Sequence, residues 1–149
     1  MPELPELETI VRGLRPRLLG RRIVRARLRH KSLYRRGSLR VPWLAGRVIR
    51  SVERIGKNAL VRFDPSGLMV INLGMTGNLR VQRAGETGGK RKHLHGRFYL
   101  DNGDELHFFD PRRFGHLFIA EACDFARDLN IGPDPFVATA LYLGERLRD

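Results

Sequence analysis

Cysteine is almost absent from this sequence, because Cys123 is the only one. No intrachain disulfide and no cysteine-rich zinc site can therefore form within these residues, and we expect a reducing, cytoplasmic compartment. The sequence also lacks an apolar run as long as a membrane helix, and it shows no leader with a cleavage site. These features together predict a soluble protein without a membrane partner.

Lysine is also scarce, although the chain is strongly basic. Lysine and arginine number 28 against 16 acidic residues, which gives a net charge of +12, and only four of the 28 are lysines. The other 24 are arginines, whose planar guanidinium suits bidentate contacts with phosphates and bases. This charge indicates a polyanionic partner, most often nucleic acid, with an anionic membrane surface as the lesser option.

The spacing of apolar residues predicts one long helix followed by many strands. A helix over residues 3–19, ended by Gly20, has one apolar face at steps of three and four: Leu4, Leu7, Val11, Leu14 and Leu18. Residues 21–29 then alternate, with Val24, Ala26 and Leu28 expected inward and arginines outward. Further strands are expected at 47–55, 59–63, 68–73, 79–82 and 116–120, with two more strands around an Asn102-Gly103 turn. The fold class predicted is mainly β with flanking helices: an antiparallel two-sheet β-sandwich with a long N-terminal helix.

The first six residues allow two interpretations. Removal of Met1 would leave a secondary amine on Pro2, and an α-amino group has a pKa of about 7.7–8.0. Part of it would then be neutral near pH 7 and able to attack a carbonyl carbon, with Glu3 and Glu6 close enough in sequence to move protons. Alternatively, the prolines pre-set the backbone at a helix entry, where acidic residues favour the helix dipole. The stretch by itself favours this second interpretation.

Five motifs occur in an order and at spacings that resemble the formamidopyrimidine-DNA glycosylase family, from end to end of the chain. They are Met1-Pro2-Glu3-Leu4-Pro5-Glu6, Gly56-Lys57, Leu73-Gly74-Met75-Thr76-Gly77, Asp110-Pro111-Arg112-Arg113-Phe114-Gly115 and Gly132-Pro133-Asp134-Pro135. The resemblance implies a bifunctional repair enzyme that removes 8-oxoguanine and formamidopyrimidines and then cuts the strand by β,δ-elimination. By this resemblance Pro2 is the nucleophile that forms an imine, Glu3 the main proton-transfer group and Glu6 a supporting carboxylate. The first interpretation of the amino terminus is then preferred.

The resemblance also implies residues that touch DNA. The resemblance groups Lys57 with the catalytic residues and implies that it contacts phosphate near the lesion, although a solvated turn lysine is the ordinary alternative. Met75, Arg112 and Phe114 resemble the triplet that fills the void left by the flipped nucleotide, where apolar wedges offset the cost of unstacking. Without the resemblance, Met75 and Phe114 would be assigned to the core.

Three polar residues near these motifs have less distinctive signals. His93 and His95 would face the same side of a strand, which suggests a metal site, but no acidic or cysteine partner is adjacent. Phosphate contact in this basic stretch is the better interpretation, and no metal site is predicted. Asn72 stands where the family commonly has a histidine, and its amide can still donate to a phosphate.

We expect residues 1–131 to form the catalytic β-sandwich domain and residues 132–149 to be a connector into a helix-two-turn-helix domain. That domain, with the family's zinc finger, would lie outside this chain, so no cofactor is expected within it. The expected partner is double-stranded DNA that contains an oxidised purine or an abasic site, bound by a monomer in the bacterial cytosol or nucleoid. The alternatives are a catalytically silent DNA-binding fragment and a general basic RNA-binding β-domain.

Overall fold

The computed structural model of the chain describes residues 4–74, 76–86, 93–111 and 115–121. One helix comes first, and strands with two short 3-10 helices follow. Their bounds are α1 (Leu4–Leu18), β1 (Ile23–Leu28), η1 (Lys31–Leu33), η2 (Val41–Leu44), β2 (Val48–Ile55), β3 (Asn58–Asp64), β4 (Leu68–Asn72), β5 (Asn78–Gln82), β6 (Leu94–Leu100), β7 (Glu105–Phe109) and β8 (His116–Ala120). The predicted connector at 132–149 lies outside the described residues.

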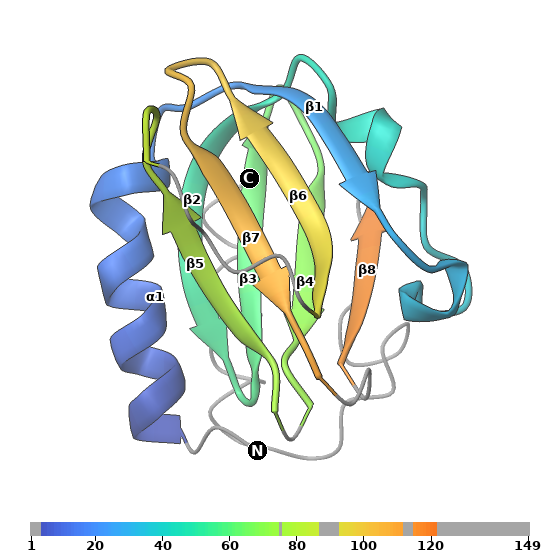
Figure 1. Cartoon of the computed structure of the whole chain (residues 1–149). Coiled ribbons are helices and arrows are strands. Elements are labelled where there is room, and N and C mark those ends of the chain that lie inside the picture. Colours follow the sequence, from blue (N-terminus) through green and yellow to red (C-terminus); the bar gives the residue numbers. More distant parts are fainter. Residues whose placement is uncertain (1–3, 75, 87–92, 112–114, 122–149) are drawn as a thin grey trace, which may run out of the picture.

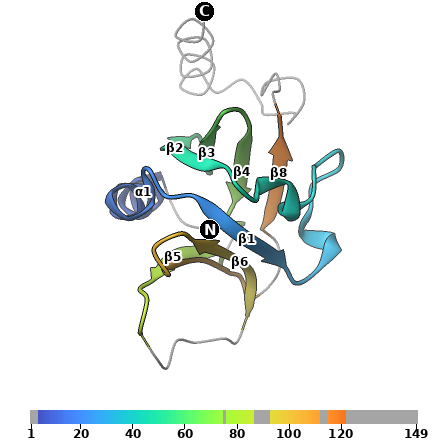
Figure 2. The ribbon, with the colours of Figure 1, turned by 90° about the horizontal axis from the view of Figure 1, so that it is seen from above.

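The eight strands form two antiparallel sheets that face each other, with strand orders β1-β6-β7-β5 and β2-β3-β4-β8. Figures 1 and 2 show the two layers, with α1 beside the open edge where β5 of one sheet and β2 of the other lie closest to it. The predicted fold class, an antiparallel two-sheet β-sandwich with an N-terminal helix, is confirmed.

The hydrophobic core fills the space between the sheets and under the helix. The predicted apolar face of α1 is buried at Leu7, Val11, Leu14 and Leu18, each at most 5% exposed. They pack in one cluster with strand residues that include Phe63, Phe98 and Phe108. Burial of an apolar side chain of this size contributes roughly 1.5–3 kcal/mol. The N-terminal helix is therefore fixed to the core from Leu7 to Leu18.

The prediction that Val24 points inward from the first strand is wrong. Val24 is 52% exposed, whereas Ala26 is buried and Leu28 packs partly against the core. The register of β1 against β6 shifts between Ile23 and Arg25, so the strand carries a bulge at this point. A bulge inserts one extra residue and breaks the alternation of faces, which explains why Ile23 and not Val24 points inward.

The hairpins expected from turn residues are present. β6 and β7 pair antiparallel on either side of Asn102-Gly103, and β2 and β3 pair through the two-residue turn Gly56-Lys57. In the described part of the chain, no helix is long and apolar enough to cross a membrane.

Candidate functional site

The described parts of four of the five sequence motifs lie at one end of the sandwich. The β2–β3 turn, the β4–β5 connection, the β7–β8 connection and the first turn of α1 all lie at this end (Figure 1). The register shows the same arrangement, because Asn58, Asn72 and His116 pair side by side on neighbouring strands. Antiparallel pairing thus brings together segments that are distant in the sequence.

Asp110 is the central polar residue of this end. Its side chain is fully buried, and its Oδ1 accepts a hydrogen bond from Thr76 Oγ1 at 2.7 Å. Its Oδ2 accepts from the backbone N–H of Gly115 at 2.6 Å. Hydrogen bonds to a charged acceptor are shorter and stronger than neutral ones. One carboxylate therefore joins the β4–β5 connection to the β7–β8 connection, the two segments that contain Met75, Arg112 and Phe114.

The backbone of Asp110 ties in a third segment. Its N–H donates to the carbonyl of His93 at 3.0 Å, and its carbonyl accepts from His95 Nε2 at 2.6 Å. Because a carbonyl can only accept, the Nε2 atom of His95 carries the proton. The start of β6 is thereby fixed against the same residue that holds the two connections.

Gly115 allows the close approach that these bonds require. A Cβ atom at this position would lie 2.7 Å from the backbone oxygen of Asn72, 2.9 Å from the ring of Phe108 and 3.0 Å from Asp110 Oδ2. Any larger residue would have to push backbone or a buried ring aside. The glycine of the Asp110–Gly115 motif is thus explained by packing.

Asn72 links two neighbouring turns. Its Nδ2 donates to Asn58 Oδ1 at 3.0 Å, and its Oδ1 accepts from the backbone N–H of Gly74 at 2.8 Å. Asn58 directly follows Lys57, which is exposed at the tip of the β2–β3 turn. The amide of Asn72 therefore orders the approach to the β4–β5 connection, and its contact with phosphate stays a prediction.

The turn that presents Lys57 is also tied to the N-terminal helix. Arg54 Nε donates to Glu8 Oε2 on α1 at 3.1 Å, while Arg54 Nη1 donates to the carbonyl of Gly56 at 2.9 Å. Gly56 has φ = 59°, the left-handed region that a two-residue hairpin turn requires at its first position. One guanidinium thus connects the helix to the lysine turn.

Glu8 is ionised more easily than an isolated glutamate. Partial burial alone would raise its pKa, but hydrogen bonds from Arg54 and Arg12, together with their positive charges, outweigh burial and lower the pKa. The carboxylate therefore remains charged well into the acid range and keeps the helix attached to β2.

The predicted site residues fall into two groups. One group lies outside the described residues, although neighbouring segments are described. It consists of Pro2, Glu3, Met75, Arg112 and Phe114.

The other predicted residues are placed. Glu6 is exposed in the first turn of α1, and Lys57 is exposed on its turn. His93 precedes β6 with φ = 63°, and only His95 lies in the strand, 5% exposed. The alternation expected for the two histidines is therefore wrong, and their contact with phosphate stays a prediction. Among the described residues, no group of three or more His, Cys, Asp or Glu side chains could hold a metal ion.

The sequence had not assigned roles to four residues that organise this end. Asp110 and Thr76 lie inside quoted motifs, so the motifs pointed to them without showing that they bond to each other. Glu8 and Arg54 carried no such signal, because a helical glutamate and a strand arginine are ordinary surface residues. Only their proximity in space shows their role.

The described residues define an antiparallel β-sandwich domain with an N-terminal helix anchored to it, and the described parts of four sequence motifs lie at one end. The chain belongs to the formamidopyrimidine-DNA glycosylase family, since residues 1–117 match the family model described as "Formamidopyrimidine-DNA glycosylase N-terminal domain".

Individual relatives agree with this membership. The chain is 42% identical over 157 residues to the formamidopyrimidine-DNA glycosylase of Geobacter sulfurreducens, covering 99% of this chain and 55% of the relative. The crystal structure of MutM (Fpg) from Thermus thermophilus matches with a TM-score of 0.71 and 36% identity over 90% of this chain and 47% of that one. The Lactococcus lactis Fpg in complex with abasic-site DNA matches with a TM-score of 0.71 and 26% identity over 80% and 44%. The chain thus spans about half the length of the relatives it matches.

Proposed function

We propose that this chain provides the catalytic part of a bifunctional DNA repair enzyme that excises oxidised purines, such as 8-oxoguanine and formamidopyrimidines, and then cuts the strand. The observation that carries this proposal is the Asp110 junction, by which we mean the hydrogen bonds of the Asp110 carboxylate to Thr76 and Gly115. These bonds join the β4–β5 connection to the β7–β8 connection at one end of the sandwich. The names of the family and of its relatives, and the abasic-site DNA in the Lactococcus lactis complex, support the substrate class.

The proposed nucleophile is the amine of Pro2, freed by removal of Met1. Its nitrogen lone pair attacks C1′ of the sugar, the bond from C1′ to the base breaks, and the base leaves with that electron pair and takes up a proton. Glu3 is the main group that moves protons, and Glu6 supports it by ordering water or the sugar. The nitrogen then loses its proton, its lone pair forms the C=N bond, and the C1′–O4′ bond breaks with a proton added to O4′. The product is a ring-opened iminium between Pro2 and C1′.

Strand cleavage follows from the electron demand of this iminium. It withdraws electrons from C2′, so a C2′ proton is lost and the C3′–O bond breaks with departure of the 3′ phosphate. A second elimination removes the 5′ phosphate. The imine is then hydrolysed, which returns the free amine of Pro2.

The remaining predicted residues hold DNA in this proposal. Lys57 contacts a phosphate from its exposed turn, and Asn72, His93 and His95 contact further phosphates. Met75, Arg112 and Phe114 fill the space of the flipped nucleotide, as inserted side chains do in proteins that kink DNA. The enzyme acts as a monomer in the bacterial cytosol or nucleoid, where its DNA lies.

Borohydride trapping tests the nucleophile. The chain with Met1 removed, verified by intact mass, is incubated with a duplex that contains an abasic site and is reduced with borohydride. We expect a covalent adduct that peptide mapping locates on Pro2. The matched control is the same chain with Met1 retained, in which the Pro2 nitrogen is an amide and no adduct on Pro2 is expected. Failure to form the adduct with a confirmed free amine would contradict the proposal.

The same preparation separates the alternatives. Tight binding of the abasic duplex without an adduct would identify a catalytically silent DNA-binding fragment. Equal affinity for undamaged RNA and for lesion DNA would instead identify a general basic RNA-binding domain. Sedimentation with and without DNA measures the oligomeric state.

A further inference from the structure

A basic groove lies where β1 ends beside the start of β6. Its volume is about 430 Å³, and it is lined by Arg27, Leu28, Arg29, Leu94, His95 and Arg97. It adjoins the Asp110 junction, because His95 donates to the carbonyl of Asp110. The groove is thus continuous with the end of the sandwich where the motifs meet, although no motif includes its arginines.

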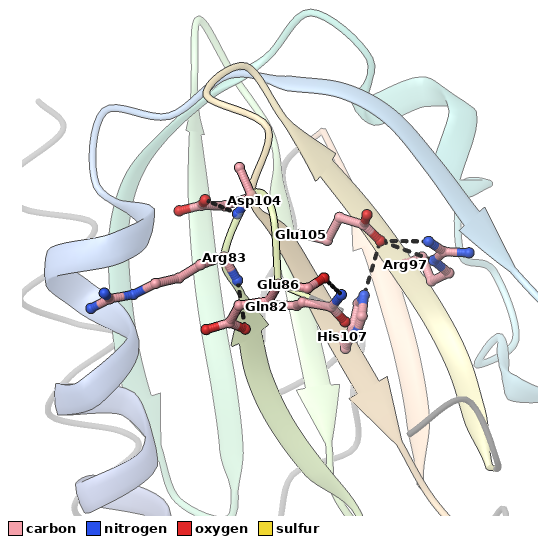
Figure 3. A network of polar contacts seen from close by, with 8 residues as sticks. Gln82, Arg83, Glu86, Arg97, Asp104, Glu105 and His107 are labelled. Atoms are coloured by element: carbon pink, nitrogen blue, oxygen red, sulfur yellow. Dashed lines mark hydrogen bonds and ion pairs between the residues drawn. The ribbon is translucent and has the colours of Figure 1, made fainter. Parts of the chain in front are cut away.

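Two of these arginines face each other directly. Arg27 pairs with Arg97 in the register of β1 and β6, and like charges opposite each other on a sheet are destabilising. Arg97 has a counter-ion, since its Nη2 and Nε donate to Glu105 Oε1 at 2.7 and 3.0 Å. Figure 3 shows Glu105 between Arg97 and His107, whose Nε2 donates to the same oxygen at 3.0 Å. The one nearby carboxylate oxygen that bonds to Arg97 is therefore already shared.

Arg27 and Arg29 are not neutralised in this way. Both are exposed, and neither makes a side-chain hydrogen bond or ion pair with any residue in the described part of the chain. Both line the groove, Arg27 from β1 and Arg29 from the position directly after Leu28, the last residue of that strand. Two cations without counter-ions, beside a third whose charge is balanced, give the groove a net positive charge.

His95 forms part of the groove lining with one nitrogen unused. Its Nε2 is committed to the Asp110 carbonyl, and its Nδ1 is buried and has no hydrogen-bond partner among the described residues. The ring of His30 packs beside it with the centroids 5.5 Å apart. A phosphate bound in the groove would change the electrostatic environment of this ring, so the nitrogen-15 resonances of His95 would shift when the groove is occupied.

We propose that this groove binds a phosphate group of the DNA backbone, held by the guanidinium groups of Arg27 and Arg29. Guanidinium offers paired donors that match phosphate oxygens, and the groove lies next to the end on which the lesion would be processed. DNA would then extend from that end along the β1–β6 edge. The inference rests on the proposed function, because DNA supplies the phosphate.

The test compares two double variants that lose the same charge from opposite ends of one strand. Arg27→Gln with Arg29→Gln removes the groove cations, and Arg21→Gln with Arg22→Gln removes two arginines about 20 Å away, at the start of β1. Affinity for a fluorescent duplex with an abasic-site analogue is measured over a range of NaCl concentrations. We expect the groove variant to bind about tenfold more weakly. Its slope of log affinity against log salt should be shallower by about 0.9 for each phosphate that it no longer binds. The other variant should keep the wild-type slope.

Equal slopes in the two double variants would overturn the inference.

A second experiment follows the His95 ring by nitrogen-15 NMR while the duplex or inorganic phosphate is added to the wild-type chain. A response to the duplex at far lower concentration than to inorganic phosphate supports a DNA phosphate, and equal responses overturn that assignment. The borohydride adduct of the wild-type chain is scored separately. An adduct with equal slopes rejects only the groove, and different slopes without an adduct reject only the proposed lyase chemistry.

Discussion

Thr76 and Asp110 are 34 residues apart in the sequence, yet the hydroxyl of Thr76 donates to Asp110 Oδ1 at 2.7 Å. This bond, with the one from Gly115, makes a single buried carboxylate the junction of two connections that carry motif residues. The arrangement of this end of the sandwich therefore depends on the junction and on the contacts around it.

Asp110→Asn should destabilise the domain strongly. The amide removes the negative charge and offers one acceptor oxygen in place of two. Either the N–H of Gly115 loses its acceptor, or the Thr76 hydroxyl must accept from the amide and its own proton loses its acceptor in a buried site. A buried donor left unsatisfied costs about 1–3 kcal/mol, and the lost charge assistance adds to this. Urea unfolding measures the change. Asp101→Asn is the matched control, because Asp101 is exposed and its ion pair with Arg21 is 3.6 Å long, so at most about 1 kcal/mol is expected there. Similar losses in both variants would contradict the central role of Asp110.

Gly115→Ala should also destabilise the domain, by about 1–3 kcal/mol, because the new Cβ meets the backbone of Asn72 and the ring of Phe108. Gly13→Ala provides a comparison of opposite sign. Gly13 lies within α1, and a Cβ there would meet nothing within 4 Å apart from its chain neighbours and the backbone of its own helix. Alanine in a helix is more stable than glycine by roughly 0.5–1 kcal/mol. Thermal melting of both variants should therefore move the midpoint in opposite directions, and a shared direction would argue against the close packing at Gly115.

Arg54→Lys tests the connection between the helix and the Lys57 turn. Lysine keeps the charge but lacks the fork that lets Arg54 reach Glu8 and the carbonyl of Gly56 together. We expect a loss of about 1 kcal/mol in stability and weaker binding of abasic-site DNA. Arg50→Lys is the control, since Arg50 makes only an exposed pair with Asp64 at 3.7 Å in the described part of the chain. An equal effect of the two variants on DNA binding would show that the connection does not position Lys57.

The ion pair between Glu105 and Arg97 should make the stability of the domain depend on pH. Burial alone would raise the pKa of Glu105, but hydrogen bonds from His107 and Arg97 and their charges lower it below the ordinary value. A carboxyl whose folded pKa is depressed stabilises the fold fully above its unfolded pKa of about 4.3, and this contribution is lost as the pH falls through the folded pKa.

Glu105→Gln should therefore differ from wild type by a nearly constant free energy of unfolding between about pH 5 and 7, and the difference should shrink below about pH 4. Urea unfolding of both proteins at several pH values gives this difference. A gap that persists unchanged at the lowest pH would mean that the carboxylate charge does not hold Arg97 in place.

The sequence by itself determined the elements and the family. Apolar spacing of three and four marked α1, alternation and turn residues marked the strands, and ordered motifs marked the glycosylase resemblance. These signals are local or depend on residue order, so no tertiary contact is needed to detect them. Val24 was misassigned because a bulge is not visible in a binary pattern of apolar and polar residues.

Only the tertiary structure decided which residues organise the functional end. The bonds of Asp110 to Thr76 and of Arg54 to Glu8 join segments 34 and 46 residues apart, and the groove at Arg27 and Arg97 depends on the register of two strands that are distant in the sequence. Hydrogen bonds and charge pairs act over a few ångströms, and strand pairing sets those distances. The sequence therefore pointed to the motifs, and the packing of the two sheets decided how those motifs are held together.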